Sequence, residues 1–117
     1  MKRAKKILIA EDELLVARVL RMQFEKEGFE VENVVDADTA YIKAMQMKPD
    51  VILLDIRLKN NTSGIEAANK LRESGVNCLI LFTTGNSYES TIKEIAHIAN
   101  AKILIKPVDF KTILSYI

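Results

Sequence analysis

The sequence has few of the residues that mark disulfide-rich, membrane-spanning or strongly charged proteins. It contains one cysteine, Cys78, which excludes an internal disulfide and leaves no clustered cysteine motif for a metal. The 17 basic and 16 acidic residues nearly cancel to a net charge of +1, so direct binding to nucleic acid or to a membrane is not expected. No apolar run approaches the length of a signal peptide or a membrane span. These absences favour a cytoplasmic protein with an ordinary hydrophobic core.

The 117 residues suit one compact domain in which short apolar runs alternate with longer amphipathic stretches. The apolar runs predict five strands, over residues 7–10, 29–35, 51–54, 78–82 and 103–105. Apolar residues at helical spacing predict five helices, at about 13–27, 36–47, 64–74, 86–99 and 109–117. Asp36 and Asp109 can cap two of these helices, and Asn86 or Ser87 a third. Residues 59–63 are expected to form a polar loop.

This alternation predicts an α/β fold with parallel strands and right-handed crossovers. Five such units close most naturally into a single flavodoxin-like, doubly wound sheet with strand order 2-1-3-4-5 and helices on both faces. The second strand carries Glu30 and Glu32 between apolar residues, as a half-exposed edge strand does. In such sheets the ligand site lies beyond the carboxyl ends of the strands, so the residues that follow each strand indicate the function.

Charged and hydroxyl residues follow four of the five predicted strands. Glu11 and Asp12 follow the first strand, Asp55 the third, Thr83 the fourth and Lys106 the fifth. Clustered carboxylates repel one another unless a cation compensates them, and Mg²⁺ prefers oxygen ligands of this kind. Lys106 supplies a second positive charge suited to a phosphoryl oxygen, and Thr83 supplies a neutral donor. Asp55 can then act as a carboxylate nucleophile that receives a phosphoryl group.

The order of these residues resembles the receiver domains of two-component response regulators. That family has an acidic pair after the first strand, Asp after the third, Thr after the fourth and Lys-Pro after the fifth. The residues at 55–58 and 64–68 are also similar to the corresponding family stretch. The resemblance covers essentially the whole chain. It implies that residues 1–117 form a receiver domain. The short last helix fits a domain cut from a longer regulator or a hybrid kinase, and a stand-alone receiver is the alternative.

The resemblance also implies a role for each residue that touches the phosphoryl group. Asp55 is expected to be the phosphoacceptor, Thr83 the switch hydroxyl and Lys106 the partner of the phosphoryl group, with a cis Lys106–Pro107 bond. The expected phosphodonor is a sensor histidine kinase or a phosphotransfer protein, and the output goes to an unknown effector domain or target. Ile103 departs from the family, which usually has an aromatic residue at this position of the fifth strand.

The ligands of the metal follow from the same resemblance. Asp12 is expected to bind Mg²⁺ directly, Glu11 mostly through water, and Asp55 and the backbone carbonyl of Arg57 are the remaining protein ligands. A domain of this kind assists its own phosphorylation and dephosphorylation but is not expected to be an enzyme in its own right.

Two other functions remain open on the sequence alone. A Mg²⁺-dependent phosphohydrolase with an aspartate nucleophile needs a second acid two residues after the nucleophile, where this chain has Arg57. A flavodoxin-like electron carrier needs a phosphate-cradling loop after the first strand, where this chain has three acidic residues. Lys70 and Arg72 are interpreted as a solvated helix face, and His97 is expected to lie away from the site.

Overall fold

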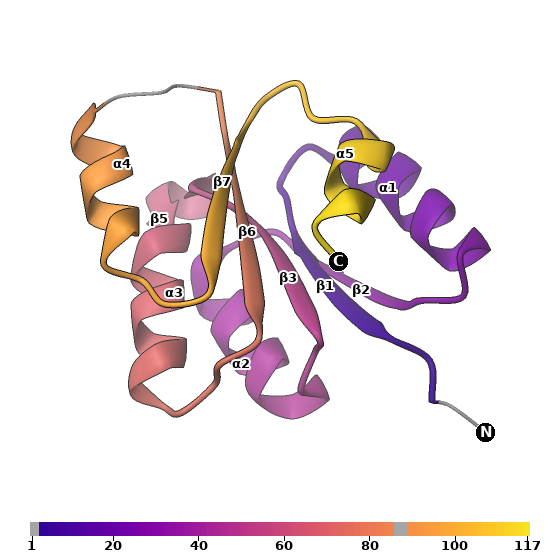
Figure 1. Cartoon of the computed structure of the whole chain (residues 1–117), viewed down its shortest axis with the longest axis horizontal. Helices are drawn as coiled ribbons and strands as arrows, with labels where there is room; N and C mark the ends of the chain where they lie inside the picture. Colours follow the sequence, from indigo (N-terminus) through magenta and orange to yellow (C-terminus); the bar gives the residue numbers. More distant parts are fainter. Residues whose placement is uncertain (1–2, 86–88) are drawn as a thin grey trace.

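The computed structural model describes residues 3–85 and 89–117 and shows a parallel sheet of five strands flanked by helices (Figure 1). The strands follow the order β2-β1-β3-β6-β7, and each pairs in parallel with its neighbours. Their bounds are β1 Lys6–Ala10, β2 Glu30–Val34, β3 Val51–Asp55, β6 Leu79–Thr84 and β7 Ala101–Ile105. The predicted fold class, strand order 2-1-3-4-5 and edge position of the second strand are therefore confirmed.

Helices connect the strands of the sheet. Within the described ranges they are α1 Leu14–Lys26, α2 Ala37–Met47, α3 Gly64–Glu73, α4 Glu89–Ala96 and α5 Phe110–Ser115. The predicted caps of α2 and α5 are confirmed, because the Asp36 and Asp109 side chains each accept a hydrogen bond from the backbone N–H three residues on, at 2.7 and 2.8 Å. None of these helices is long and apolar enough to cross a membrane.

The structure differs from the sequence predictions at α4 and at the expected loop. Helix α4 ends before residue 99 because the chain turns to bury Ile98, whose N–H donates to the Ile95 carbonyl. The expected caps Asn86 and Ser87 lie outside the described residues. The expected loop is part of a small antiparallel hairpin, made of β4 Arg57–Leu58, a 3-10 turn Lys59–Asn61 and β5 Thr62–Ser63.

The hairpin is held by local hydrogen bonds and by its asparagines. Asn60 and Asn61 adopt left-handed backbone conformations, with φ of 63° and 58°, which asparagine tolerates better than most residues. The Thr62 hydroxyl donates to the Lys59 carbonyl and accepts from the Ala37 amide. These bonds attach the hairpin to the start of α2, at the edge of the sheet where the strands end.

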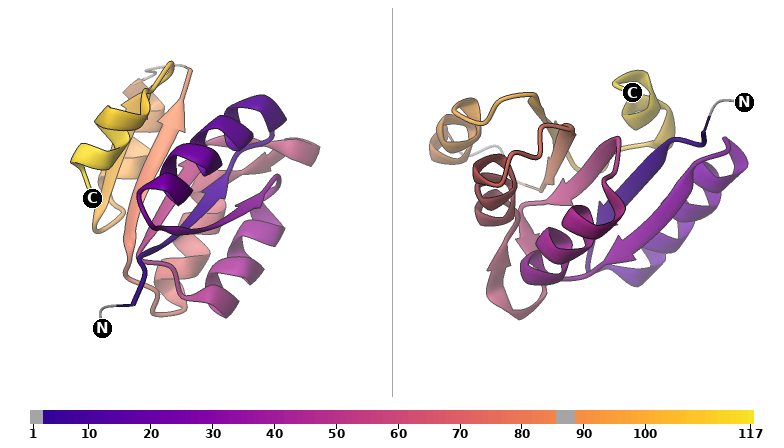
Figure 2. Two further views of the ribbon diagram at one scale, coloured as in Figure 1. Left: turned by 90° about the vertical axis from the view of Figure 1, so that its right-hand side faces the viewer. Right: turned by 90° about the horizontal axis from the view of Figure 1, so that it is seen from below.

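Side chains of the sheet alternate between two apolar layers. Helices α1 and α5 cover one face of the sheet, called here the α1/α5 face, and α2, α3 and α4 cover the opposite face, called the α2–α4 face (Figures 1 and 2). In β3, Val51 and Leu53 pack on the α1/α5 face, whereas Ile52 and Leu54 pack on the α2–α4 face. This burial on both sides explains the continuous apolar runs of the central strands.

Candidate functional site

The alternation of the strands brings four predicted site residues to the α1/α5 face. Residues two apart in a strand point to the same side of the sheet, so each apolar row on this face continues into one polar residue. The rows are Ile7, Ile9, Glu11; Val51, Leu53, Asp55; Leu81, Thr83; and Leu104, Lys106. Register adds a second constraint, since Asp55 of β3 lies directly beside Thr83 of β6.

The Lys106 ammonium bridges two buried carboxylates. Its Nζ lies 2.6 Å from Asp55 Oδ2 and 3.1 Å from Glu11 Oε1. Glu11 and Asp55 are only 4% and 6% exposed. Their remaining oxygens accept backbone N–H groups, from Glu13 to Glu11 at 3.1 Å and from Arg57 to Asp55 at 3.2 Å. Every oxygen of the two carboxylates therefore accepts a hydrogen bond, as burial of charge requires.

Burial and charge act in opposite directions on this cluster. Burial raises the pKa of the Glu11 carboxyl, and the hydrogen bonds from the Glu13 amide and the Lys106 ammonium offset only part of that effect. Burial also works against the charged form of Lys106, but the adjacent Asp55 and Glu11 carboxylates outweigh it and raise the pKa of the ammonium. Lys106 is therefore held as a fixed positive charge at the end of β7.

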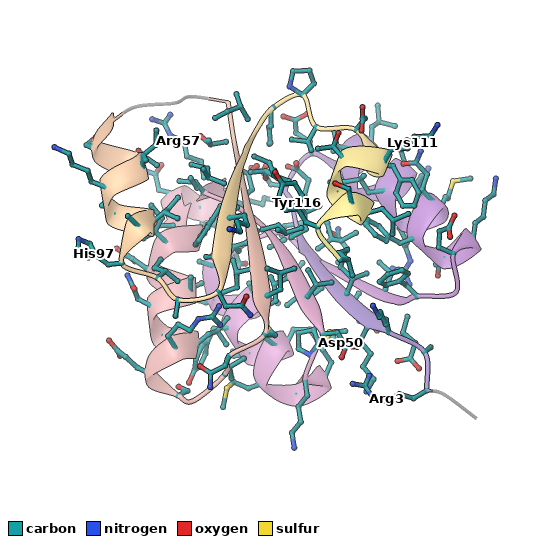
Figure 3. All side chains as sticks on the ribbon, viewed as in Figure 1. Arg3, Asp50, Arg57, His97, Lys111 and Tyr116 are labelled. Carbon is teal, nitrogen blue, oxygen red and sulfur yellow. The ribbon has the colours of Figure 1, made fainter. Side chains whose placement is uncertain are left out.

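Asp12 completes a cluster of three carboxylates whose chemistry fits a divalent cation. Glu11, Asp12 and Asp55 each offer an oxygen, and these oxygens all lie within 4.8 Å of one another. Asp12 is exposed, so a cation can reach the cluster from solvent. Arg57 lies two residues beyond Asp55, and Figure 3 shows it at the same edge of the sheet. One ammonium does not neutralise three carboxylates, and oxygen donors of this kind suit a hard cation such as Mg²⁺.

Gly64 packs directly against the backbone of Asp55. Its N–H donates to the Ile56 carbonyl at 2.8 Å, and its Cα lies against the end of β3. A Cβ at this position would overlap the Asp55 carbonyl oxygen and come within 3.1 Å of the carbonyl carbon. The first residue of α3 therefore has to be glycine for the helix to approach the strand this closely.

Thr83 and the Lys106–Pro107 bond are placed as expected. Thr83 is 6% exposed, lies beside Asp55 in the sheet, and makes no side-chain hydrogen bond within the described part of the chain. The Lys106–Pro107 bond is cis. Ile103 packs on the α2–α4 face, in register with the fully buried Phe82. An aromatic ring is thus present in this layer, but it belongs to β6 rather than to β7.

A match to a known protein family covers residues 7–117, and the family is described as the response regulator receiver domain. The chain belongs to this family. Among curated relatives, response regulator ArlR of Staphylococcus saprophyticus is 30% identical over 112 residues, which is 96% of this chain and 50% of that protein. Transcriptional regulatory protein ResD of Bacillus subtilis is 35% identical over 78 residues, or 67% of this chain and 32% of that protein. The matched stretches thus make up a third to a half of these relatives.

Solved structures of receiver domains share the same fold. A CheY-like receiver domain from Methanospirillum hungatei superposes with a TM-score of 0.87 at 25% identity, covering 96% of this chain and 89% of that one. The receiver domain of a modulated diguanylate cyclase from Desulfovibrio desulfuricans gives 0.81 at 31% identity, covering 97% and 90%. This receiver domain is therefore a phosphoacceptor signalling domain, and the comparisons support neither the phosphohydrolase nor the electron-carrier alternative.

One interaction of the receiver domain was missed in the sequence. Arg72, interpreted as solvated, points into the loops at the start of β6 and β7, where its guanidinium donates to the carbonyls of Val76, Cys78, Ala99 and Asn100 at 2.7–3.2 Å. Lys70 is exposed, as interpreted, and its Nζ also lies 4.4 Å from the centre of the Tyr41 ring. Neither contact has a local sequence signal, because Ala99, Asn100 and Tyr41 come from other segments of the chain. His97 is exposed just after the end of α4 (Figure 3).

Proposed function

We propose that Asp55 of this receiver domain accepts a phosphoryl group. The observation that carries the proposal is a buried carboxylate at the end of a central strand, 2.6 Å from an ammonium and among two further carboxylates. Transfer forms a bond between an Asp55 oxygen and phosphorus while the bond from phosphorus to the donor breaks. Lys106, already within reach of Asp55, stabilises the charge that the phosphoryl oxygens carry.

Mg²⁺ is the proposed metal, held by the oxygens of Glu11, Asp12 and Asp55 together with the backbone carbonyl of Arg57. When bound, the ion neutralises charge on the carboxylates and on the incoming phosphoryl group. The protein contributes the arrangement of the ligands. Glu11 is held by the Glu13 amide, and Asp55 by the Arg57 amide, so two of the carboxylates are oriented before any metal arrives.

Thr83 is proposed to be the residue that senses phosphorylation. Thr83 lies beside Asp55 and is only 6% exposed, and its hydroxyl has no partner in the described part of the chain, so a phosphoryl oxygen on Asp55 would give it an acceptor. A movement of β6 toward that oxygen would carry the signal to the surface.

We also propose that the chain acts as a switch in a phosphotransfer system. A histidine kinase or a phosphotransfer protein supplies the phosphoryl group in the cytoplasm, and the chain acts as a switch rather than an enzyme that turns over a separate substrate. Residues 1–117 act as the receiver domain of this system, in keeping with relatives of about twice this length, one of which is named a transcriptional regulatory protein.

Intact-protein mass after treatment with acetyl phosphate and Mg²⁺ tests the role of Asp55. The wild-type protein should gain the mass of one phosphoryl group, and Asp55→Ala should gain none. Asp38→Ala serves as the matched control, because Asp38 is an exposed carboxylate in the first turn of α2, and it should behave as wild type. An adduct of undiminished yield in Asp55→Ala would show that another residue is the acceptor.

A further inference from the structure

A cavity of about 430 Å³ lies between α1 and α5, beside the phosphorylation site on the α1/α5 face. Its walls are apolar and consist mainly of Val16, Leu20, Leu53, Val108 and Ile113. Its volume lies within the range of roughly 300–1,000 Å³ that is usual for small-molecule sites, which combine apolar walls with a few polar groups.

The polar groups of the cavity are unevenly charged. Glu11, Glu13 and Lys106 line it, so two carboxylates face one ammonium. The Lys106 charge is already shared between Glu11 and Asp55, at 3.1 and 2.6 Å. Glu13 is exposed at the mouth and forms no ion pair within residues 3–85 and 89–117. The net charge of the groups that line the cavity is therefore negative, which disfavours an anionic ligand and favours a cationic one.

Thr83 adds a hydrogen-bonding group to the same cavity. The residue is only 6% exposed and lines the cavity wall, and its hydroxyl has no partner among the described residues. The hydroxyl oxygen is therefore available to accept a hydrogen bond from a ligand donor. An ammonium has three donors, and the Thr83 hydroxyl and the Glu13 carboxylate are acceptors that it can use.

We propose that the cavity between α1 and α5 is a binding site for a small amphipathic amine, whose apolar body packs between the two helices and whose ammonium faces Glu13 and Thr83. This site is distinct from the carboxylate cluster that receives the phosphoryl group, although Glu11 and Lys106 border both. The proposal does not depend on the role of Asp55, because binding is measured in EDTA and without a phosphodonor.

Three probes with the same apolar body and different head groups test the proposal: phenylbutylamine, phenylbutanol and phenylbutyrate. Each is titrated into the ¹⁵N-labelled protein in EDTA at neutral pH, with backbone chemical shifts as the readout. The amine should bind at least tenfold more tightly than the carboxylate, with the alcohol between them, and the shifts should centre on Val16, Val108 and Ile113. Equal affinity for all three probes, or no saturable binding of the amine, would overturn the proposal.

Matched variants of α1 separate the cavity from the outer surface of the helix. Val16→Phe places a ring in the cavity and should weaken the amine at least tenfold. Val19→Phe makes the same change three residues on, at a residue that does not line the cavity, and should leave the affinity within twofold. Both side chains are partly exposed, at 39% and 53%, so neither change disturbs the core. Unchanged amine binding in Val16→Phe would place the probe elsewhere.

The head-group contact has its own variant. Glu13→Gln keeps the shape of the side chain and removes its charge, so the amine should lose most of its advantage over the alcohol. The matched control is Glu27→Gln, an exposed glutamate at the other end of α1, which should change neither affinity. A preference for the amine that survives Glu13→Gln would contradict the assigned orientation of the ligand.

Discussion

Replacing Asp55 by asparagine should stabilise the metal-free domain, although the change breaks a short ion pair. The wild-type carboxylate is 6% exposed and attracted by Lys106 at 2.6 Å. It is also repelled by two carboxylates that offer oxygens within 4.8 Å. Asparagine keeps the shape and can still accept a hydrogen bond from Lys106, which retains Glu11 as an ionic partner at 3.1 Å. The sign of the change therefore depends on how the attraction and the two repulsions compare.

The magnitudes nearly cancel and leave a small gain for asparagine. At 2.6 Å and an effective dielectric constant near 20, the attraction to Lys106 is about 6 kcal/mol. At 4.8 Å, a like-charged carboxylate costs about 3.5 kcal/mol at the same dielectric constant. Solvent screens the exposed Asp12, but the desolvation cost of the Asp55 charge disappears in the mutant. The net gain is about 1 kcal/mol, which corresponds to a rise of roughly 3–5 °C in melting temperature.

Thermal and urea unfolding in EDTA and in saturating Mg²⁺ measure this balance. In EDTA the mutant should be more stable, and Asp12→Asn, which relieves repulsion without touching Lys106, should be stabilised as well. Mg²⁺ should stabilise the wild type by mass action, by about 2.7 kcal/mol at a hundred times its dissociation constant, and Asp55→Asn much less. A mutant less stable than wild type in EDTA, with no Mg²⁺ effect on either protein, would refute the reasoning and make Asp55 a structural partner of Lys106.

The remaining predictions concern other contacts of the receiver domain. Thr83→Ala should leave phosphoryl uptake largely intact but weaken the chemical-shift response of β6 and β7 to beryllofluoride; an undiminished response would remove Thr83 from the switch. Gly64→Ala should cost about 1–3 kcal/mol in urea unfolding because the methyl group overlaps the carbonyl at the end of β3, whereas Gly85→Ala, with open space around its Cα, should change little. Arg72→Lys should lower the free energy of unfolding by about 1–3 kcal/mol, since an ammonium cannot span the four carbonyls that the guanidinium reaches. A decrease of less than about 0.5 kcal/mol would contradict this role. The pKa of the Asp50 carboxyl is lowered by its hydrogen bonds and attraction to Arg3. The ionised carboxylate therefore stabilises the fold above the unfolded-state pKa, and this stabilisation is lost as the pH falls through the lower folded-state pKa. Asp50→Asn should cost about 1 kcal/mol at pH 7 and flatten the acid limb of a stability–pH curve.

The fold and the place of the site follow from the sequence because both depend on periodic patterns. Apolar runs broken by amphipathic stretches fix the alternation of strands and helices, and the handedness of the crossovers leaves few topologies. The polar residues after each strand then meet at one edge of the sheet. The spacing of two within strands also predicts which face they share, and this signal is present in the rows that end at Asp55 and Lys106.

Contacts between distant segments could not be predicted in this way. The role of Arg72 depends on two loops more than twenty residues apart meeting at the end of α3, as its bonds to Val76 and Ala99 show. The hairpin of β4 and β5 depends on left-handed backbone at Asn60 and Asn61, which asparagine permits but does not require. The cavity depends on the distance between α1 and α5, a property of packing that no residue type encodes.

The two ends of the sheet make opposite contributions to stability, and this division explains how the site can hold its charges. At the carboxyl end, three carboxylates face one ammonium, an arrangement in which like charges repel one another and oppose folding. At the amino end, Arg3 pairs with Asp50 through both oxygens at 2.7 and 2.9 Å, and Figure 3 shows this pair at the edge opposite to Arg57. Arg72 joins the loops that lead into β6 and β7 at that same end. Because these contacts involve no residue of the carboxylate cluster, they stabilise the fold independently of the charges at the carboxyl edge.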